Sequence, residues 1–405
     1  MTNNQLPKLR AVDARPIVHG GRPSILLRDP LQLAAGSVVI PQQLAPVLML
    51  CDGTRDVGGL CAAFAVRFGL RVGPGILEQL LATFDEAFLL DNERFTQARE
   101  SARAEYRQAP FRPPNLAGKS YPAETDALRR LLQGYLDQVE DGHPDLNGGR
   151  GLVSPHIDYA RGGLVYASVW KRAAETVKAA ELVVLLGTDH FGGDGSLTLT
   201  RQHYATPFGV LPTEQEIVDA LAQAMGPEAA FADELHHRSE HSIELAAGWL
   251  HHIREGQPCE LLPILCGSFG HFLRGEEALE DDPVIAALIE TLRQTMAERR
   301  TLVVAAGDLS HVGPAFGGQP LDWAGRARLQ TADEELIERM CAGDGQGFYA
   351  ALKRDGDRRN VCGLPPIYLA LRLLDPVEGK LISYEHCPAD EKGTSLVSIC
   401  GAVFK

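Results

Sequence analysis

Over residues 110–405, short apolar runs alternate with longer stretches that carry apolar residues at helical spacing. Near-continuous apolar runs rich in β-branched residues are typical of buried strands. Five such runs stand out, namely GRGLVSPH, ELVVLLGTDH, CELLPILCGS, TLVVAAGDLSH and SLVSICGAVF. Between them lie helical patterns such as LVYASVWKRAAETVKAA and PVIAALIETLRQTMAERR. This alternation predicts an α/β fold, in which a mixed sheet is covered by helices.

The first 107 residues follow a different pattern. Both LAPVLMLCDGTRDVGGLCAAFAVRFG and GILEQLLATFDEAFLLDNERF place apolar residues at helical spacing. The segment CDGTRD predicts a turn, with Gly53 ending one helix and Thr54 or Asp56 capping the next. FLLDNERF is predicted to leave the last helix as a strand. Together these elements predict a small winged-helix-like domain that is mostly α.

A proline-rich stretch, QAPFRPPNLAGKSYPAE at residues 108–124, separates the two patterns. It follows the charged, helix-like segment DNERFTQARESARAEYRQ and is predicted to connect two folding units. We therefore expect one domain at residues 1–107 and a second at residues 110–405. For the first domain, a helical docking domain remains an alternative. A DNA-binding winged helix is disfavoured, because the segment has few basic residues and no basic stripe.

Composition and charge narrow the function classes. The 405 residues are 45% apolar and 23% charged, which is ordinary for a globular protein. The formal net charge of −14 argues against a nucleic-acid partner or an anionic membrane surface. No apolar stretch is long enough for a signal peptide or a membrane span. The eight scattered cysteines include no CxxC pair, so we expect reduced thiols and a cytoplasmic protein.

Polar side chains follow three of the predicted strands. Ligands of open α/β sheets gather at the carboxyl ends of strands, so we expect these side chains to meet at one edge of the sheet. In chain order they are His156 with Asp158, Asp189 with His190, and Asp308 with His311.

Two further candidates precede helices. EHSIELAAGWL puts Glu240 and His241 at a helix start, and NVCGLPPIYLAL puts Cys362 where a helix dipole favours a thiolate. Each candidate also has a purely structural explanation. Asp308 could cap a turn, Glu240 could favour a helix N-terminus, and Cys362 could be a small buried hydrophobe. As a set, imidazole, carboxylate and thiolate suit iron, zinc or copper rather than magnesium or calcium.

The second domain resembles the Memo family, also called AmmeMemoRadiSam system protein B. The matching segments, in order, are LAGKSYPAE, SPHIDY, LLGTDH, TPFG, VLPTE, SEHSIE, LLPILCG, GDLSHVG, VCG and SLVSICGAVF. The resemblance implies the fold of the class III extradiol dioxygenases, with metal ligands at His156, His190 and Cys362. It further implies that the same cleft is lined by His241, Asp308, His311 and Glu240. Two carboxylates depart from the family pattern beside the expected metal, Asp158 and Asp189.

The resemblance implies a non-haem iron centre and a dioxygenase-like oxidoreductase. Fe²⁺ is the expected metal, with Zn²⁺ or copper as alternatives. His241 or His311 would act as acid or base, and Asp308 would orient one of them or hold a water. Two other functions stay open. The domain could be a peptide- or partner-binding scaffold with a structural or absent metal, or a zinc hydrolase.

The first domain resembles the PqqD-like domains that recognise peptides beside radical-SAM enzymes. The resemblance rests on LCDGTRDVGGLCAAFAVRFG and on the last helix. It implies a peptide as a partner of the first domain. The Memo resemblance implies a radical-SAM protein and an AMMECR-type protein as further partners.

Overall fold

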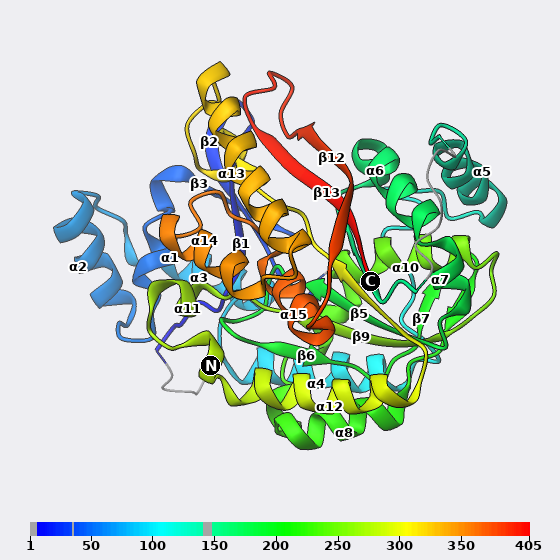
Figure 1. The fold of residues 1–405 in the computed structure, drawn as a ribbon. Helices are drawn as coiled ribbons and strands as arrows, with labels where there is room; N and C mark the ends of the chain where they lie inside the picture. The colour runs from blue at the N-terminus through cyan, green and yellow to red at the C-terminus, as the bar shows by residue number, and fades with distance from the viewer. Residues whose placement is uncertain (1–5, 35, 141–147) are drawn as a thin grey trace. The chain divides into compact units, whose positions relative to one another are not determined.

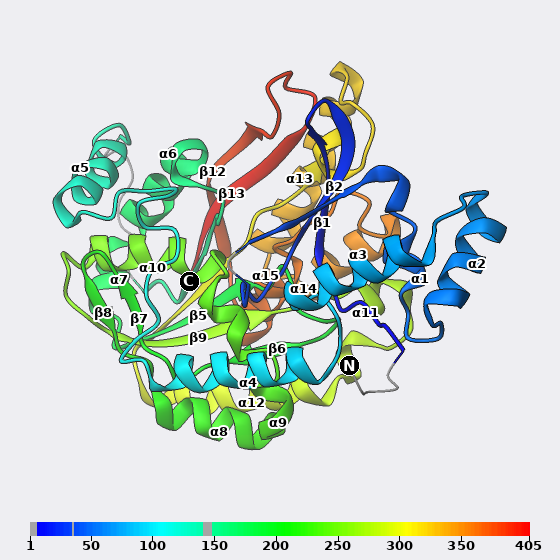
Figure 2. The ribbon, with the colours of Figure 1, turned by 180° about the vertical axis from the view of Figure 1, so that it is seen from behind.

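The computed structural model describes residues 6–34, 36–140 and 148–405 (Figures 1 and 2). Within it the chain divides into two compact units, Met1–Gln108 and Ala109–Lys405. We call them unit 1 and unit 2.

Unit 1 combines an antiparallel sheet with helices. Its three strands pair in the order β1 (Asp13–His19), β2 (Arg22–Arg28) and β3 (Val38–Pro41). The helical elements that follow are η1 (Gln42–Leu44), α1 (Val47–Leu50), α2 (Val57–Phe68), α3 (Pro74–Glu86) and α4 (Glu93–Gln108).

Local signals explain the helix boundaries of unit 1. Asp56 caps α2 by accepting a hydrogen bond from the Gly59 N–H at 2.7 Å, as the sequence predicted. The predicted strand after α3 is wrong, since Leu90 forms only an isolated bridge and α4 begins at Glu93. The cause is Asn92, whose side chain accepts from the Phe95 N–H at 3.0 Å and so caps a helix. Strand β1 was not predicted, because most of its side chains are exposed and give no buried apolar face.

A mixed sheet forms the centre of unit 2, in the order β11-β13-β4-β10-β5-β9-β6, with β12 paired to β13. Four adjacent strands, β4, β10, β5 and β9, run parallel, while β13 and β6 flank them in antiparallel pairing. All five predicted strands are present. The bounds are β4 (Gly151–Ser154), β5 (Leu182–Thr188), β6 (Leu197–Leu199), β9 (Glu260–Cys266), β10 (Thr301–Ala306), β11 (His311–Val312), β12 (Gly379–Pro388) and β13 (Leu396–Phe404). A separate hairpin is formed by β7 (Tyr204–Thr206) and β8 (Gly209–Leu211).

Helices cover both faces of this sheet (Figures 1 and 2). One core contains side chains from α8 (Gln215–Met225), α9 (Pro227–Ala230), α12 (Pro283–Glu298), α13 (Trp323–Cys341), α14 (Gly345–Asp355) and α15 (Leu364–Leu374). The other contains side chains from α5 (Thr125–Leu136), α6 (Tyr159–Arg172), α7 (Ala174–Ala179) and α10 (Ser242–Ile253). The remaining short elements are η2 (Glu234–Arg238), α11 (Gly270–Arg274), η3 (Leu279–Asp281) and η4 (Pro314–Phe316).

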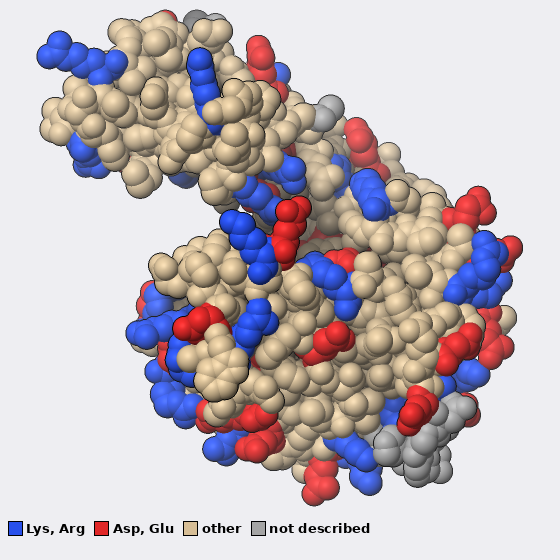
Figure 3. All heavy atoms as spheres, turned by 90° about the horizontal axis from the view of Figure 1, so that it is seen from above, with Lys and Arg blue, Asp and Glu red and all other residues tan. Residues whose placement is uncertain are grey.

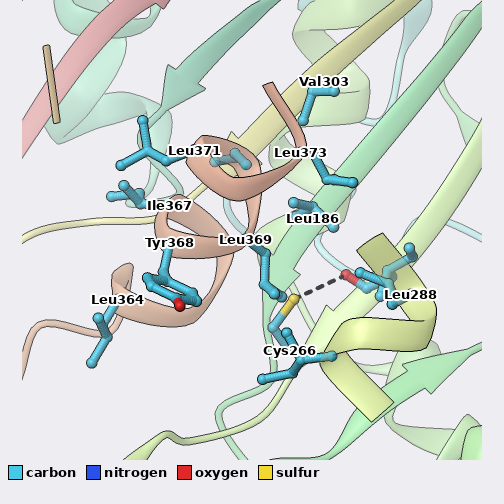
Figure 4. Close-up of a cluster of buried hydrophobic side chains, with 14 of the residues drawn as sticks. Leu186, Cys266, Leu288, Val303, Leu364, Ile367, Tyr368, Leu369, Leu371 and Leu373 are labelled. Atoms are coloured by element: carbon cyan, nitrogen blue, oxygen red, sulfur yellow. Dashed lines mark hydrogen bonds between the residues drawn. The ribbon is translucent and has the colours of Figure 1, made fainter. Parts of the chain in front are cut away.

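The central strands are buried on both faces, which explains their continuous apolar sequences. In β5, Val184 and Leu186 join the core of α12 and α15. The alternate residues Val183 and Leu185 join the core of α6 and α10. Figure 4 shows side chains of α15 packed beside Leu186 of β5 and Cys266 of β9. Because side chains alternate across a strand, two apolar faces require an unbroken apolar run.

The proline-rich stretch at residues 108–124 is more than a connector. Arg112 is fully buried, and its Nη1 donates to Glu244 of α10 at 2.5 Å. The same carboxylate accepts hydrogen bonds from the Asn115 N–H, the Leu116 N–H and the Tyr121 hydroxyl. These contacts with α10 make residues 109–124 an integral part of unit 2, and breaking the buried ion pair would be strongly destabilising.

Three further features concern the helices, the charged surface and the cysteines. Among the described residues, no helix is both long and apolar enough to cross a bilayer. On the face drawn in Figure 3, Lys and Arg side chains are interspersed with Asp and Glu side chains. All eight cysteines are free thiols.

Candidate metal centre

Three adjacent parallel strands end at the candidate site. In the sheet, β10 lies between β4 and β5. His156 follows the end of β4 by two residues, Asp308 follows β10 by two, and His190 follows β5 by two. The carboxyl edge of a parallel sheet is where α/β proteins bind ligands, and the sheet order places these three residues on that edge.

Three histidines come together there. His156, His190 and His241 each offer one ligand atom, and these atoms all lie within 4.8 Å of one another. The rings of His190 and His241 stack with centroids 4.8 Å apart and planes 15° apart. The ring of His156 meets them edge-on, with centroids 5.1 Å and 5.4 Å away. His241 is the N-cap residue of α10, at the predicted helix start.

Hydrogen bonds leave one nitrogen of each ring for the site. The Nδ1 of His156 lies 3.0 Å from the Ala306 carbonyl oxygen. The Nδ1 atoms of His190 and His241 each lie 3.0 Å from a different carboxylate oxygen of Glu240. A histidine that donates through Nδ1 keeps the Nε2 lone pair free, as metal-binding histidines do.

Glu240 organises this part of the site. Its buried carboxylate also accepts from the backbone N–H groups of His190, His241 and Ser242, at 3.1, 2.6 and 3.0 Å. Burial alone would raise the pKa of Glu240, but His190 and His241 outweigh it and hold the pKa well below its usual value. Glu240 therefore fixes two imidazoles, and it also favours the start of α10 as the structural explanation expected.

Cys362 lies directly beside the histidines. Its Sγ is 3.2 Å from the Nε2 of His156. Burial would raise the pKa of the Cys362 thiol, yet the imidazoles of His156 and His311 lower it well below its ordinary value. Conversely, burial opposes protonation of His156, but Asp308 and Cys362 raise its pKa to about 9. The sulfur and the imidazoles thus share protons that a metal ion would displace.

Asp308 follows the end of β10 by two residues, and His311 is the first residue of β11. Asp308 Oδ1 accepts from the His156 N–H at 2.8 Å, and Oδ2 lies 3.7 Å from the His156 Nε2. The Nδ1 of His311 lies 3.1 Å from the Asn360 carbonyl oxygen, and its ring packs edge-on against Phe316. Asp308 therefore contacts the histidine cluster directly, whereas His311, at the start of β11, lowers the pKa of the Cys362 thiol through its charge.

The carboxylates of Asp158 and Asp189 form their hydrogen bonds with residues outside the histidine cluster. Asp158 caps α6 by accepting from the Arg161 N–H at 3.1 Å and also pairs with the Arg161 guanidinium. Asp189 accepts from the Nδ1 of His236 at 2.8 Å and from the Phe191 N–H at 3.0 Å. No pattern in the sequence indicated the contact with His236, because η2 brings that histidine to β5 across a separation of 47 positions.

Comparison with known proteins agrees with this architecture. The family described as Memo-like protein matches residues 112–403. A MEMO1 family protein of Aquifex aeolicus is 26% identical over 405 residues, covering 98% of this chain and 99% of that protein. A MEMO1 family protein of Methanopyrus kandleri is 30% identical over 287 residues, covering 67% of this chain and 91% of that protein. A third MEMO1 family protein, from Methanosarcina barkeri, is 28% identical over 280 residues, covering 68% of this chain and 92% of that protein. The chain belongs to the Memo-like protein family.

Proposed function

We propose that unit 2 holds a transition-metal ion on His156, His190 and Cys362 and acts as an iron-dependent oxidoreductase. The observation that carries this proposal is the distance of 3.2 Å between the Cys362 Sγ and the His156 Nε2. Metals such as zinc bind imidazole nitrogen at about 2.0–2.1 Å and thiolate at about 2.3 Å, so two such ligands lie at most about 4.4 Å apart. The sulfur and the nitrogen are within that limit.

His241 is assigned a different role from the three ligands. Its ring stacks nearly parallel to that of His190, with the centroids 4.8 Å apart, and its ligand atom lies within 4.8 Å of those of His156 and His190. Its side chain is 38% exposed, and Glu240 holds its Nδ1. An imidazole with one nitrogen fixed and the other open to solvent suits proton transfer near neutral pH.

The chain's own residues divide the remaining tasks. Asp308 holds the backbone of His156, and Glu240 orients His190 and His241 together. Iron with open positions would supply binding and activation of dioxygen and an organic substrate. The thiolate would replace the carboxylate of the extradiol dioxygenases, which the sequence resemblance implies as relatives in fold.

Metal analysis of protein purified without oxygen tests the proposal. We expect about one iron per chain in the wild type and a loss of most iron in Cys362→Ser, because a hydroxyl is a poor anionic ligand. Cys387→Ser is the matched control, since Cys387 is also a buried thiol of unit 2. Cys362→Asp should recover part of the iron, and His241→Gln should retain it.

Each other outcome has a defined meaning. Iron lost from His241→Gln as completely as from Cys362→Ser would make His241 the third ligand. Stoichiometric zinc in place of iron would favour a hydrolase. An absence of any tightly bound metal would favour the scaffold function.

Unit 1 would supply the partner contacts in this proposal, taking a peptide, with a radical-SAM protein and an AMMECR-type protein in the same system. The supporting observation is the exposure of apolar side chains on α1, α2 and α3, where Met49 is 66%, Val66 84% and Ile76 55% exposed. Calorimetric titration of the full chain with each protein partner tests it. Val66→Glu should weaken binding, whereas Val18→Glu, on exposed β1, should not.

A further inference from the structure

A buried carboxylate outside the histidine cluster joins two segments that border the cluster. Asp333 lies in the middle of α13, and its side chain is fully buried. Its Oδ1 accepts from the Ser310 hydroxyl at 2.6 Å and from the Arg359 Nη1 at 3.0 Å. Its Oδ2 accepts from the Tyr384 hydroxyl at 2.9 Å.

Two of these partners belong to loops that carry candidate site residues. Ser310 stands between Asp308 and His311, and Arg359 precedes Cys362 by three positions. The loops also contact each other directly, because the His311 N–H donates to the Arg359 carbonyl at 2.6 Å. Asp333 therefore binds residues 308–311 and residues 359–363 with a single oxygen.

The same loops determine where the sulfur lies. The Gly363 N–H donates to the Asp308 carbonyl at 2.9 Å, and the Cys362 Sγ lies 3.7 Å from that carbonyl. Asp308 in turn accepts from the His156 N–H. A displacement of either loop would thus change the separation of the Cys362 sulfur from the His156 ring.

The third contact fixes the carboxylate from its other side. Tyr384 of β12 donates to Asp333, and its oxygen lies 2.6 Å from the Nε2 of His386. Burying an ion pair such as Asp333 with Arg359 costs desolvation energy that packed apolar side chains avoid. The pair is therefore better explained by the geometry it imposes than by a gain in stability.

We propose that Asp333 is a positioning residue, which holds residues 308–311 against residues 359–363 and so sets the Cys362–His156 separation in the metal centre. The reference to a metal rests on the proposed function. The positioning itself concerns only the two loops.

Asp333→Asn tests the role of the charge on this carboxylate. Its side-chain oxygen still accepts from Ser310, and its amide donates to the Tyr384 oxygen while that hydroxyl donates to His386. What it loses is the charge opposite Arg359, and hydrogen bonds to charged groups are the stronger ones. Leu336→Ala is the control, since Leu336 is fully buried on the same helix and its side chain has no hydrogen-bonding group.

The first measurement is hydrogen–deuterium exchange of the full chain in a chelator. We expect Asp333→Asn to speed exchange roughly tenfold or more in both 308–311 and 359–363. Leu336→Ala should lower the melting temperature and leave both segments close to the wild-type exchange. Exchange in Asp333→Asn that matches the control in both segments overturns the proposal.

The second measurement uses Co²⁺ as the probe ion. A thiolate-to-cobalt charge-transfer band in the near ultraviolet reports sulfur ligation, and we expect it in the wild type and in Leu336→Ala but weakened in Asp333→Asn. A full band in Asp333→Asn argues against the positioning role. A wild type without the band contradicts the proposed ligand set, while the exchange result still decides the role of Asp333. If Asp333→Asn does not fold, Ser310→Ala undergoes the same exchange measurement, and wild-type exchange there overturns the proposal.

Discussion

Acidification should destabilise unit 2 through one buried histidine, His237. Its Nε2 lies 3.0 Å from the Thr198 carbonyl and its Nδ1 2.5 Å from the Tyr204 hydroxyl. A neutral ring satisfies both contacts, donating through Nε2 and accepting through Nδ1. Because the ring is fully buried, burial lowers the pKa of His237 to about 3. His237→Gln removes the titration and keeps a donor that reaches Thr198.

The sign and size of the effect follow from proton linkage. In the unfolded chain a histidine takes up its proton near pH 6.5, whereas folded His237 does so only near the value of about 3. The unfolded state therefore binds more protons between these values, and the free energy of unfolding falls as pH falls through that window. At pH 5 the loss is about 2 kcal/mol, since about 1.5 pH units correspond to that energy.

Urea unfolding followed by tryptophan fluorescence measures this effect in unit 2 alone. All three tryptophans, Trp170, Trp249 and Trp323, lie in unit 2. In chelator, His237→Gln should be about 1–2 kcal/mol less stable than the wild type at pH 7.5, because the hydrogen bond between the Tyr204 hydroxyl and the His237 ring is lost. At pH 5 the wild type should have lost about 2 kcal/mol through His237, whereas His237→Gln should not. The variant should then be as stable as the wild type or more stable. Parallel curves for the two proteins would refute the reasoning.

Three further substitutions test the structure. Arg112→Ala should lower the unfolding free energy of unit 2 by about 3–5 kcal/mol, because it leaves the buried Glu244 carboxylate uncompensated; a loss below about 1 kcal/mol in urea titration would contradict this. Gly363→Ala should abolish metal uptake, because its Cβ would lie 2.5 Å from the Asp308 carbonyl oxygen; full metal content by elemental analysis would argue against it. Glu240→Gln should weaken Co²⁺ binding about 10–100-fold, since the two imidazoles bind different carboxylate oxygens and the amide replaces one of these with an NH2 donor. An unchanged titration would show that Glu240 does not orient them.

The fold of unit 2 was predictable because its strands are buried on both faces. β5 and β10 therefore appear in the sequence as unbroken apolar runs, and the polar residues that follow them lie at the sheet edge. In unit 1 the hairpin of β1 and β2 was missed, because mostly exposed side chains leave no alternating pattern.

The contacts around the site were less predictable than its location. Asp333 lies in the charged run ADEELIER, where its sequence neighbours give no indication that its own side chain is buried. Its partners Ser310 and Tyr384 are 23 and 51 positions away. Likewise, the stacking of His241 on His190 depends on how α10 packs against β5, and no local sequence pattern predicts that packing.

The order of the strands has a consequence for synthesis on the ribosome. His156 and Cys362 are 206 positions apart, and β13, which pairs with β4 beside His156, is made later still. At a translation rate of roughly 5–20 residues per second, Cys362 is synthesised about 10–40 s after His156. During that interval β4 lacks its β13 neighbour and the imidazoles lack their sulfur partner. Assembly of the proposed ligand set is therefore a late event, which follows translation of most of the chain.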